Sequence, residues 1–150
     1  MKKTVLASAI LLAIVPAAYA ATELTETIST PVTSGDFILT KDIALSTSEE
    51  TLLGARGNID NVKVNLNGNK LTLTSTNGSN CYNGVVAGAT ISGKGSVVIN
   101  QANYDNALGY GSTSIAADSI AITSAKGSAI WNDNGTHTLD GNGNGTITLT

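Results

Sequence analysis

The 150-residue sequence has one cysteine, one histidine and few aromatic residues, which make up 4% of the chain. The single cysteine, Cys81, has no second cysteine in the chain to pair with, so a fold stabilised by internal disulfides is excluded. Basic residues are also scarce, with eight Lys and Arg against eleven Asp and Glu and no basic run. The sequence therefore predicts no nucleic-acid binding, because neutralisation of phosphates dominates that affinity.

The first twenty residues differ from the rest of the chain. Lys2 and Lys3 precede an apolar run from Val5 to Val15, Pro16 ends it, and Ala18-Tyr19-Ala20 supplies small residues. This order predicts a secretory signal peptide over residues 1–20, cleaved after Ala20. The apolar run is shorter than the roughly 20 residues of a membrane anchor, and we expect no transmembrane helix after it. Removing the two lysines changes the net charge from −3 to −5 (−3 minus 2).

After residue 58 a strand–turn–strand unit recurs. In its first copy the alternating strand 62–66 is followed by the turn 67–70 and the alternating strand 71–74. Similar units follow at 87–100, 114–123 and 138–150. Apolar and polar residues alternate in each strand, which is typical of a strand with one buried face.

Three apolar positions recur along these units. The first strand ends its apolar pattern at Leu66, Ile91, Ile115 and Leu139, and the second strand begins at Leu71, Val97, Ile120 and Ile147. A weaker third position falls near Tyr82, Ala107 and Ile130. Three strands in about 24 residues predict an all-β fold, a right-handed single-stranded parallel β-helix. An antiparallel β-sandwich is the alternative, because it also has short strands separated by turns.

The alternation assigns faces to the strands. We expect these side chains to point inward: Val62, Val64, Leu66, Leu71, Leu73, Ile91, Val97, Ile99, Ile115, Ile120, Ile122, Leu139, Ile147 and Leu149. We expect these to face water: Lys63, Asn65, Thr72, Thr74, Asn100, Thr123 and Thr148.

The predicted organisation has three parts. Residues 1–20 are the signal peptide, residues 21–58 an N-terminal cap or atypical first coil, and residues 59–150 the β-helix. Within the second part, Phe37, Leu39, Ile43 and Leu45 fit either a hairpin or a first coil around residues 40–42. The last strand runs to Thr150 with no closing polar segment, so we expect a truncated chain.

No residue is assigned a catalytic, cofactor-binding or metal-binding role. His137 is the only histidine available as a base, and its place beside the turn 132–135 predicts a solvated residue. The acids Asp60, Asp105, Asp118, Asp133 and Asp140 do not follow the coil spacing, and Arg56 lies in the N-terminal part. A polysaccharide-cleaving enzyme would need such groups stacked on neighbouring coils, so we expect no enzyme activity.

The sequence contains three weaker patterns. Asp140, Asn142 and Asn144 with Gly145 match the first half of a calcium loop, although an enlarged coil turn explains them equally well. The pairs Thr72/Thr74 and Thr148/Thr150 suggest an ice-binding array, which Val98/Asn100 and Ala121/Thr123 interrupt. The aromatic residues Tyr82, Tyr104, Tyr110 and Trp131 lie near the third side of the coils, where they either pack or form a binding surface.

Two segments carry a resemblance to a known family: Thr-Ser-Gly-Asp-Phe-Ile-Leu-Thr at 33–40 and Val-Asn-Leu-Asn-Gly-Asn-Lys-Leu-Thr-Leu at 64–73. With the signal peptide, Gly127-Ser-Ala-Ile-Trp-Asn132 and the closing Thr-Ile-Thr-Leu-Thr, they resemble the N-terminal part of a pertactin-like or adhesin-type autotransporter passenger. The resemblance implies export in a Gram-negative bacterium, display at the cell surface or outer membrane, and a C-terminal β-barrel translocator that this sequence lacks. A product of 150 residues would reach only the periplasm.

The resemblance implies a non-enzymatic role in adhesion, aggregation or display. The expected partners are glycans or proteins on host or neighbouring cells, and no cofactor is expected. Two alternatives stay open: a fragment of a secreted carbohydrate-active β-helix enzyme, and a nonfunctional remnant of an interrupted autotransporter gene.

Overall fold

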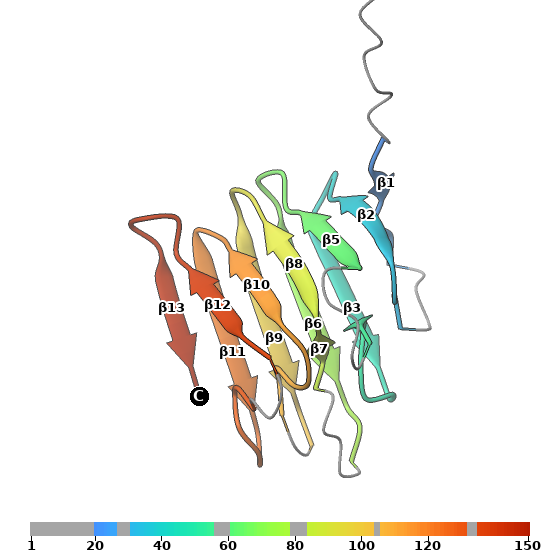
Figure 1. Ribbon diagram of the computed structural model, residues 1–150, viewed down its shortest axis with the longest axis vertical. Helices are drawn as coiled ribbons and strands as arrows, with labels where there is room; N and C mark the ends of the chain where they lie inside the picture. The colour runs from blue at the N-terminus through green and yellow to red at the C-terminus, as the bar shows by residue number, and fades with distance from the viewer. Residues whose placement is uncertain (1–19, 27–30, 56–60, 79–83, 104–105, 132–134) are drawn as a thin grey trace, which may run out of the picture.

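The computed structural model describes residues 20–26, 31–55, 61–78, 84–103, 106–131 and 135–150, and all regular elements among them are β-strands. The predicted signal peptide lies outside the described residues except for Ala20. Figure 1 labels the strands, apart from β4. They are β1 (Thr22–Glu23), β2 (Gly35–Ile38), β3 (Ile43–Thr47), β4 (Leu53–Gly54), β5 (Val62–Asn65), β6 (Lys70–Ser75), β7 (Val86–Ala87), β8 (Ala89–Ser92), β9 (Ser96–Gln101), β10 (Thr113–Ala116), β11 (Ser119–Ser124), β12 (His137–Asp140) and β13 (Thr146–Leu149).

These strands form three parallel sheets that the chain visits in turn. Sheet A has the order β1-β2-β5-β8-β10-β12, sheet C the order β3-β6-β9-β11-β13, and sheet B pairs β4 with β7. β1 and β2 both belong to sheet A, but from β2 onward successive strands belong to different sheets. From β2 onward, neighbours within a sheet are counterparts from neighbouring coils (Figure 1). Every pairing between these strands is parallel, which confirms the parallel β-helix and excludes the antiparallel sandwich.

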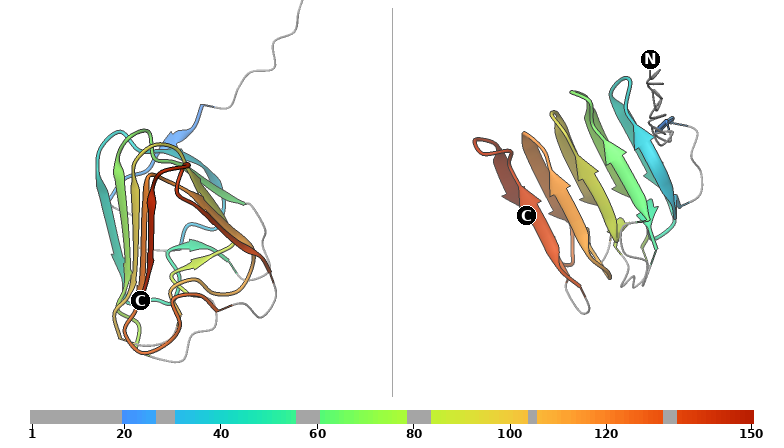
Figure 2. Two further views of the ribbon diagram at one scale, coloured as in Figure 1. Left: turned by 90° about the vertical axis from the view of Figure 1, so that its left-hand side faces the viewer. Right: turned by 45° about the horizontal axis from the view of Figure 1, so that its top comes forward.

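The coils share one outline and one winding direction. Seen from the C-terminal end, sheets A and C form two long sides that meet at a tight corner (Figure 2, left). In this view the chain climbs along β12 and descends along β13 while it advances toward the viewer (Figure 2). This counter-clockwise advance is a right-handed winding, the hand expected for parallel crossovers.

The pairing register confirms the predicted ladder of sheet C. Leu71 pairs with Val97, Val97 with Ile120, and Ile120 with Ile147, as the sequence pattern indicates. In sheet A the predicted ladder is wrong at its first step, because Ile91 pairs with Val64 and not with Leu66. Both residues lie on the inward side of the same strand region, so alternation alone cannot choose between them.

The third side of the coils is the shortest and the least regular. Leu53 pairs with Val86, and isolated bridges join Val86 to Leu108 and Leu108 to Ile130. The predicted position at Ile130 is confirmed, whereas the neighbouring coil contributes Leu108 where Ala107 is expected. Tyr82 lies outside the described residues. Because this side makes few ladder contacts, its sequence pattern is weak.

The interior of the helix consists of stacked aliphatic side chains. Eleven of the fourteen predicted inward residues are buried, from Val62 through Ile122. Leu139 is partly buried against the core, and Ile147 and Leu149 are 44% and 48% exposed, which corrects their predicted burial. These three residues keep the inward register but belong to the last coil, which has a neighbouring coil on only one side.

The N-terminal part contains a regular coil. β2 pairs in parallel with β5, and β3 pairs in parallel with β6, so the segment around residues 40–42 is a corner between two sheets and not a hairpin. Ile43 and Leu45 are 2% exposed, although they lie in the same rows as the exposed Ile147 and Leu149. The interior is therefore closed at the N-terminal coil and open at the C-terminal coil.

The corners between sheets A and C depend on backbone conformations with positive φ. Asn67 and Gly68 have φ of 49° and 84°, and Asn142 and Gly143 have φ of 50° and 88°. The side-chain amide of Asn69 spans two coils, since it donates to the Leu39 carbonyl at 3.2 Å. Glycine and asparagine therefore occur at these corners for conformational reasons.

A row of polar residues follows the aliphatic rows at the ends of β3, β6, β9 and β11. The inward register after the aliphatic rows holds Thr47, Ser75, Gln101 and Ser124. The side-chain oxygens of the first three each accept a hydrogen bond from the backbone N–H two residues later. The Ser124 hydroxyl accepts one from Gly127 N at 3.0 Å. These bonds replace ladder partners where the chain leaves the sheet.

Candidate binding surface

The outer face of sheet C carries small, uncharged side chains in register. We define the neutral face by the outward residues of β6, β9, β11 and β13, apart from Lys70: Thr72, Thr74, Ser96, Val98, Asn100, Ser119, Ala121, Thr123, Thr146 and Thr148. The outward side chains of β3, Ala44 and Ser46, continue it. Lys70 at the start of β6 lies at its margin.

The neutral face is regular because coil stacking imposes its spacing. Equivalent residues of successive coils lie about 4.8 Å apart, and alternate residues along a strand lie about 6.6 Å apart. The hydroxyl groups of Thr146 and Ser119 are 3.3 Å apart on neighbouring coils. The face therefore presents a grid of hydroxyl, amide and methyl groups.

The outer face of sheet A differs in charge. One of its rows begins with Asp36 and Lys63 before it continues through Thr90 and Ser114. The next row ends at Asp140. Two faces of similar backbone geometry thus carry different electrostatics, and only sheet C presents three neighbouring strands, β9, β11 and β13, without an outward charge.

The register places the threonine pairs as the sequence pattern predicts. Thr72 is followed across the coils by Val98, Ala121 and Thr148, and Thr74 by Asn100 and Thr123. The apolar interruptions, Val98 and Ala121, therefore lie in the middle row of the neutral face. A continuous Thr-x-Thr array is not formed.

The loop that resembles half of a calcium site uses its central side chain for another contact. The Asn142 amide donates to Asp118 Oδ1 at 2.9 Å and to the Gly93 carbonyl at 3.3 Å. The hydrogen bond from Asn142 lowers the pKa of the Asp118 carboxyl, helped by Gly95 N–H and by the charge of Lys94. The loop is therefore hydrogen-bonded to the preceding coils through the Asn142 side chain.

His137 is less solvated than its sequence position predicts. It is the first residue of β12, its Nε2 lies 3.3 Å from the Trp131 carbonyl oxygen, and its Nδ1 is buried without a hydrogen-bond partner. Burial lowers the pKa of the imidazole, and the hydrogen bond to the Trp131 carbonyl opposes that effect. In the described structure His137 pairs with neither a serine hydroxyl nor a carboxylate.

Of the four aromatic residues that the sequence suggests for the third side, Tyr110 and Trp131 are described, and both lie there. Trp131 is 39% exposed and directly follows Ile130, and Tyr110 is partly buried two residues after Leu108. Tyr82 and Tyr104 lie outside the described residues, as do Cys81, Arg56, Asp60, Asp105 and Asp133. The described structure therefore gives two aromatic side chains near this side.

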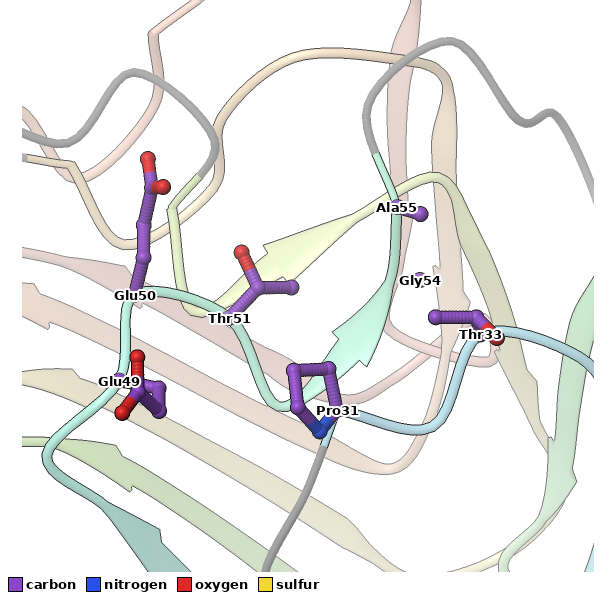
Figure 3. A pocket seen from close by; sticks show the side chains of 7 residues that line it. All are labelled: Pro31, Thr33, Glu49, Glu50, Thr51, Gly54 and Ala55. Carbon is purple, nitrogen blue, oxygen red and sulfur yellow. The ribbon is translucent and has the colours of Figure 1, made fainter.

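A pocket of about 300 Å³ opens on the first coil, which sequence reasoning did not predict. Glu49, Glu50 and Thr51 lie on one side of it, and Thr33, Gly54 and Ala55 on the other, with Pro31 between them (Figure 3). The Thr51 hydroxyl donates to the Gly84 carbonyl at 2.8 Å. The seven lining residues include two glutamates and no lysine, arginine or histidine.

The described residues contain no group of three His, Cys, Asp or Glu side chains that could hold a metal ion. Among the same residues, no helix has the length and hydrophobicity needed to cross a membrane.

Comparisons with protein families, with curated proteins and with solved structures gave no match. The architecture described above therefore rests on the pairing and burial of this chain's own residues.

Proposed function

We propose that this chain is an exported, non-enzymatic β-helical passenger segment of the autotransporter type, which mediates adhesion at the bacterial surface. The observation that carries the proposal is the division of every coil into an aliphatic interior and an outer surface rich in Ser, Thr and Asn. Coils that bury their cores on one another form a stiff support, and their outward side chains repeat along it.

Two further observations support the proposal. The sequence pattern of residues 1–20 favours export. The exposed polar groups are spread over flat sheet faces, which suits an extended contact with a macromolecule better than the enclosure of a small substrate.

Export is tested by expressing the full chain in a Gram-negative host. We expect the product in the periplasm with Ala21 as its first residue, as determined by cell fractionation and N-terminal sequencing. A cytoplasmic product that retains residues 1–20 would overturn the export step.

Adhesion is tested by fusing the chain to an autotransporter β-barrel and counting the bacteria that attach to cultured cells. A matched strain displays the Leu66→Asp variant, whose core is disrupted. We expect more attachment with the native sequence at equal surface amounts. Equal attachment of the two strains would contradict an adhesive role of the folded coils.

A further inference from the structure

We propose that Asn142 and Gly143, at the corner between β12 and β13, form a site of spontaneous deamidation whose product is a carboxylate facing Asp118. This covalent modification of the folded chain is independent of the proposed adhesive role. Three features of the corner lead to it: the free N–H group of Gly143, the contacts of the Asn142 amide and the position of Asp118.

Asparagine followed by glycine recurs in this chain. Six asparagines precede a glycine: Asn67, Asn77, Asn83, Asn134, Asn142 and Asn144. Glycine has no side chain to shield its amide nitrogen, so such a step favours attack of that nitrogen on the asparagine side chain. Three of the six, at positions 67, 142 and 144, lie at described corners between sheets A and C.

The reaction balances with water as its only co-reactant. The Gly143 amide nitrogen loses its proton to water and attacks Cγ of Asn142. A bond forms between this nitrogen and Cγ, the bond from Cγ to Nδ2 breaks, and Nδ2 takes up a proton and leaves as ammonia. Water then opens the cyclic imide at either carbonyl group, which leaves aspartate or isoaspartate at position 142.

The three corner steps differ in what holds the glycine N–H group. Gly68 N–H donates to the Lys94 carbonyl of the next coil at 2.8 Å. Gly145 N–H donates to the Gly141 carbonyl at 2.6 Å. Within the part of the chain that the structure describes, Gly143 N–H donates to no backbone carbonyl, because β12 and β13 are the last strands of their sheets. Its nitrogen alone among the three can attack without first breaking a backbone hydrogen bond.

In other respects the corners at Asn67 and Asn142 are closely matched. The two asparagines have φ of 49° and 50°, and the glycines that follow have φ of 84° and 88°. All four residues are exposed, and a Cβ on either glycine would have no atom within 4 Å. Each asparagine amide donates to a carbonyl of an earlier coil, Asn67 to Leu39 at 3.1 Å and Asn142 to Gly93 at 3.3 Å. The glycine N–H group is therefore the main difference between the two corners.

The product changes the contact that joins this corner to the preceding coil. The Asn142 amide donates to Asp118 Oδ1 at 2.9 Å. This hydrogen bond and the one from Gly95 N–H lower the pKa of the Asp118 carboxyl, so the group is ionised at neutral pH. A carboxylate at position 142 cannot donate to Asp118 and repels it. Deamidation thus replaces an attractive contact with a repulsive one and should loosen the last coil.

The first test incubates the folded full chain at neutral pH and maps deamidation by tryptic digestion and tandem mass spectrometry. Trypsin releases residues 64–70, which contain Asn67, and residues 127–150, which contain Asn142 and Asn144. One hydrogen bond corresponds to roughly a tenfold change in rate, so we expect Asn142 to react about tenfold faster than the other two. Equal rates, or faster reaction at Asn67 or Asn144, would overturn the proposal.

The same measurement in urea separates the folded structure from the local sequence. All three glycine N–H groups are released in the unfolded chain, so we expect the three asparagines to react at rates within about threefold of one another. A preference for Asn142 in urea as large as the one in the folded chain would show that the hydrogen bonds at the corners do not set the rates.

Two variants test the effect of the product on the last coil. Asn142→Asp introduces the charge, and Asn142→Ser is the matched control that removes the amide without a charge. Hydrogen exchange of the β12 and β13 backbone amides is the measurement. We expect exchange at least about threefold faster in Asn142→Asp than in Asn142→Ser, because repulsion from Asp118 adds to the lost hydrogen bond. Equal exchange in the two variants would overturn the predicted effect of the charge.

A reciprocal substitution identifies Asp118 as the group that faces the product. Asp118→Asn combined with Asn142→Asp exchanges the donor and the acceptor of the same hydrogen bond. We expect exchange in β12 and β13 to return to within about twofold of the native chain. Circular dichroism verifies that the double variant folds. Exchange as fast as in Asn142→Asp alone would overturn the role of Asp118.

Discussion

At the scale of single residues, position relative to the strand alternation decides how much a side chain contributes to stability. Leu66 is fully buried, and its neighbour Asn65 faces outward. The Asn65 side-chain oxygen accepts a hydrogen bond from Asn67 N at 2.9 Å, a contact that an aspartate at the same position retains. Adjacent residues thus differ in burial and in the chemistry that they tolerate.

This difference predicts that an introduced aspartate has a large effect on stability at position 66 and a small effect at position 65. Leu66→Asp should unfold the chain, because burying an unpaired carboxylate costs several kcal/mol or more. Asn65→Asp should change the free energy of unfolding by no more than about 0.5 kcal/mol. Urea unfolding followed by circular dichroism measures both, and similar losses in the two variants would contradict the assigned faces.

His137 gives a prediction about pH. Burial lowers its pKa in the folded chain from the ordinary value of 6.5, so the unfolded chain binds a proton first as the pH falls. The stabilising contribution of the neutral imidazole is complete above pH 6.5 and is lost as the pH drops through 6.5 and then through the folded pKa.

The measurement compares urea unfolding of the native chain and of His137→Gln on both sides of that range. We expect the native chain to lose more stability on acidification than the variant does. An equal loss in both proteins would show that His137 does not cause this part of the pH dependence.

At the scale of elements, the corners and the short third side are limited by backbone geometry. Gly54 in β4 and Gly68 in the corner before β6 have similar φ of 89° and 84°. They differ in space: a Cβ at Gly54 would lie 1.8 Å from the Ala87 carbonyl oxygen, and a Cβ at Gly68 has no atom within 4 Å. A side chain at Gly68 would therefore meet only the conformational strain of a positive φ, whereas a side chain at Gly54 would meet that strain and a steric clash.

Alanine substitutions test this separation. Gly68→Ala should cost about 1–2 kcal/mol, the ordinary penalty for a left-handed backbone with a side chain. Gly54→Ala should cost at least about 2 kcal/mol more, because β4 and β7 must move apart. Thermal unfolding compares the variants, and equal costs would contradict the close approach of the coils at Gly54.

At the scale of the whole molecule, stability depends on the stacking of each coil on its neighbours. Ile120 and Ile147 occupy the same inward row and pair with one another, but their exposed fractions are 1% and 44%. The identical side chain thus has a neighbouring coil on both sides in one case and on one side in the other.

Truncation of these two isoleucines measures how much a neighbouring coil on the second side contributes to the free energy of unfolding. Ile120→Ala should destabilise the chain by about 2–5 kcal/mol through lost burial and a cavity. Ile147→Ala should cost about 1 kcal/mol, since nearly half of its side-chain region already contacts water. Denaturant unfolding of both variants checks the difference, and equal costs would mean that the last coil is covered in solution.

The sequence by itself determined the class of fold, because alternation in short segments and recurrence of aliphatic positions report directly on which side chains are buried. It gave the register of sheet C correctly from Leu71 to Ile147. It also assigned five positions of the neutral face to the outside, namely Thr72, Thr74, Asn100, Thr123 and Thr148, although a list of positions does not show that they combine into one surface without charge.

Only the tertiary structure decided the features that depend on contacts between coils. Val64 and Leu66 fit the alternation equally well, and pairing with β8 selects Val64 as the partner of Ile91. The exposure of Ile147 and the contact of Asn142 with Asp118 likewise depend on which coil lies alongside. Alternation along a strand shows which side chains point inward and which point outward. The extent of burial, the hydrogen bonds between coils and the charge of a whole face depend on strands that are distant in sequence.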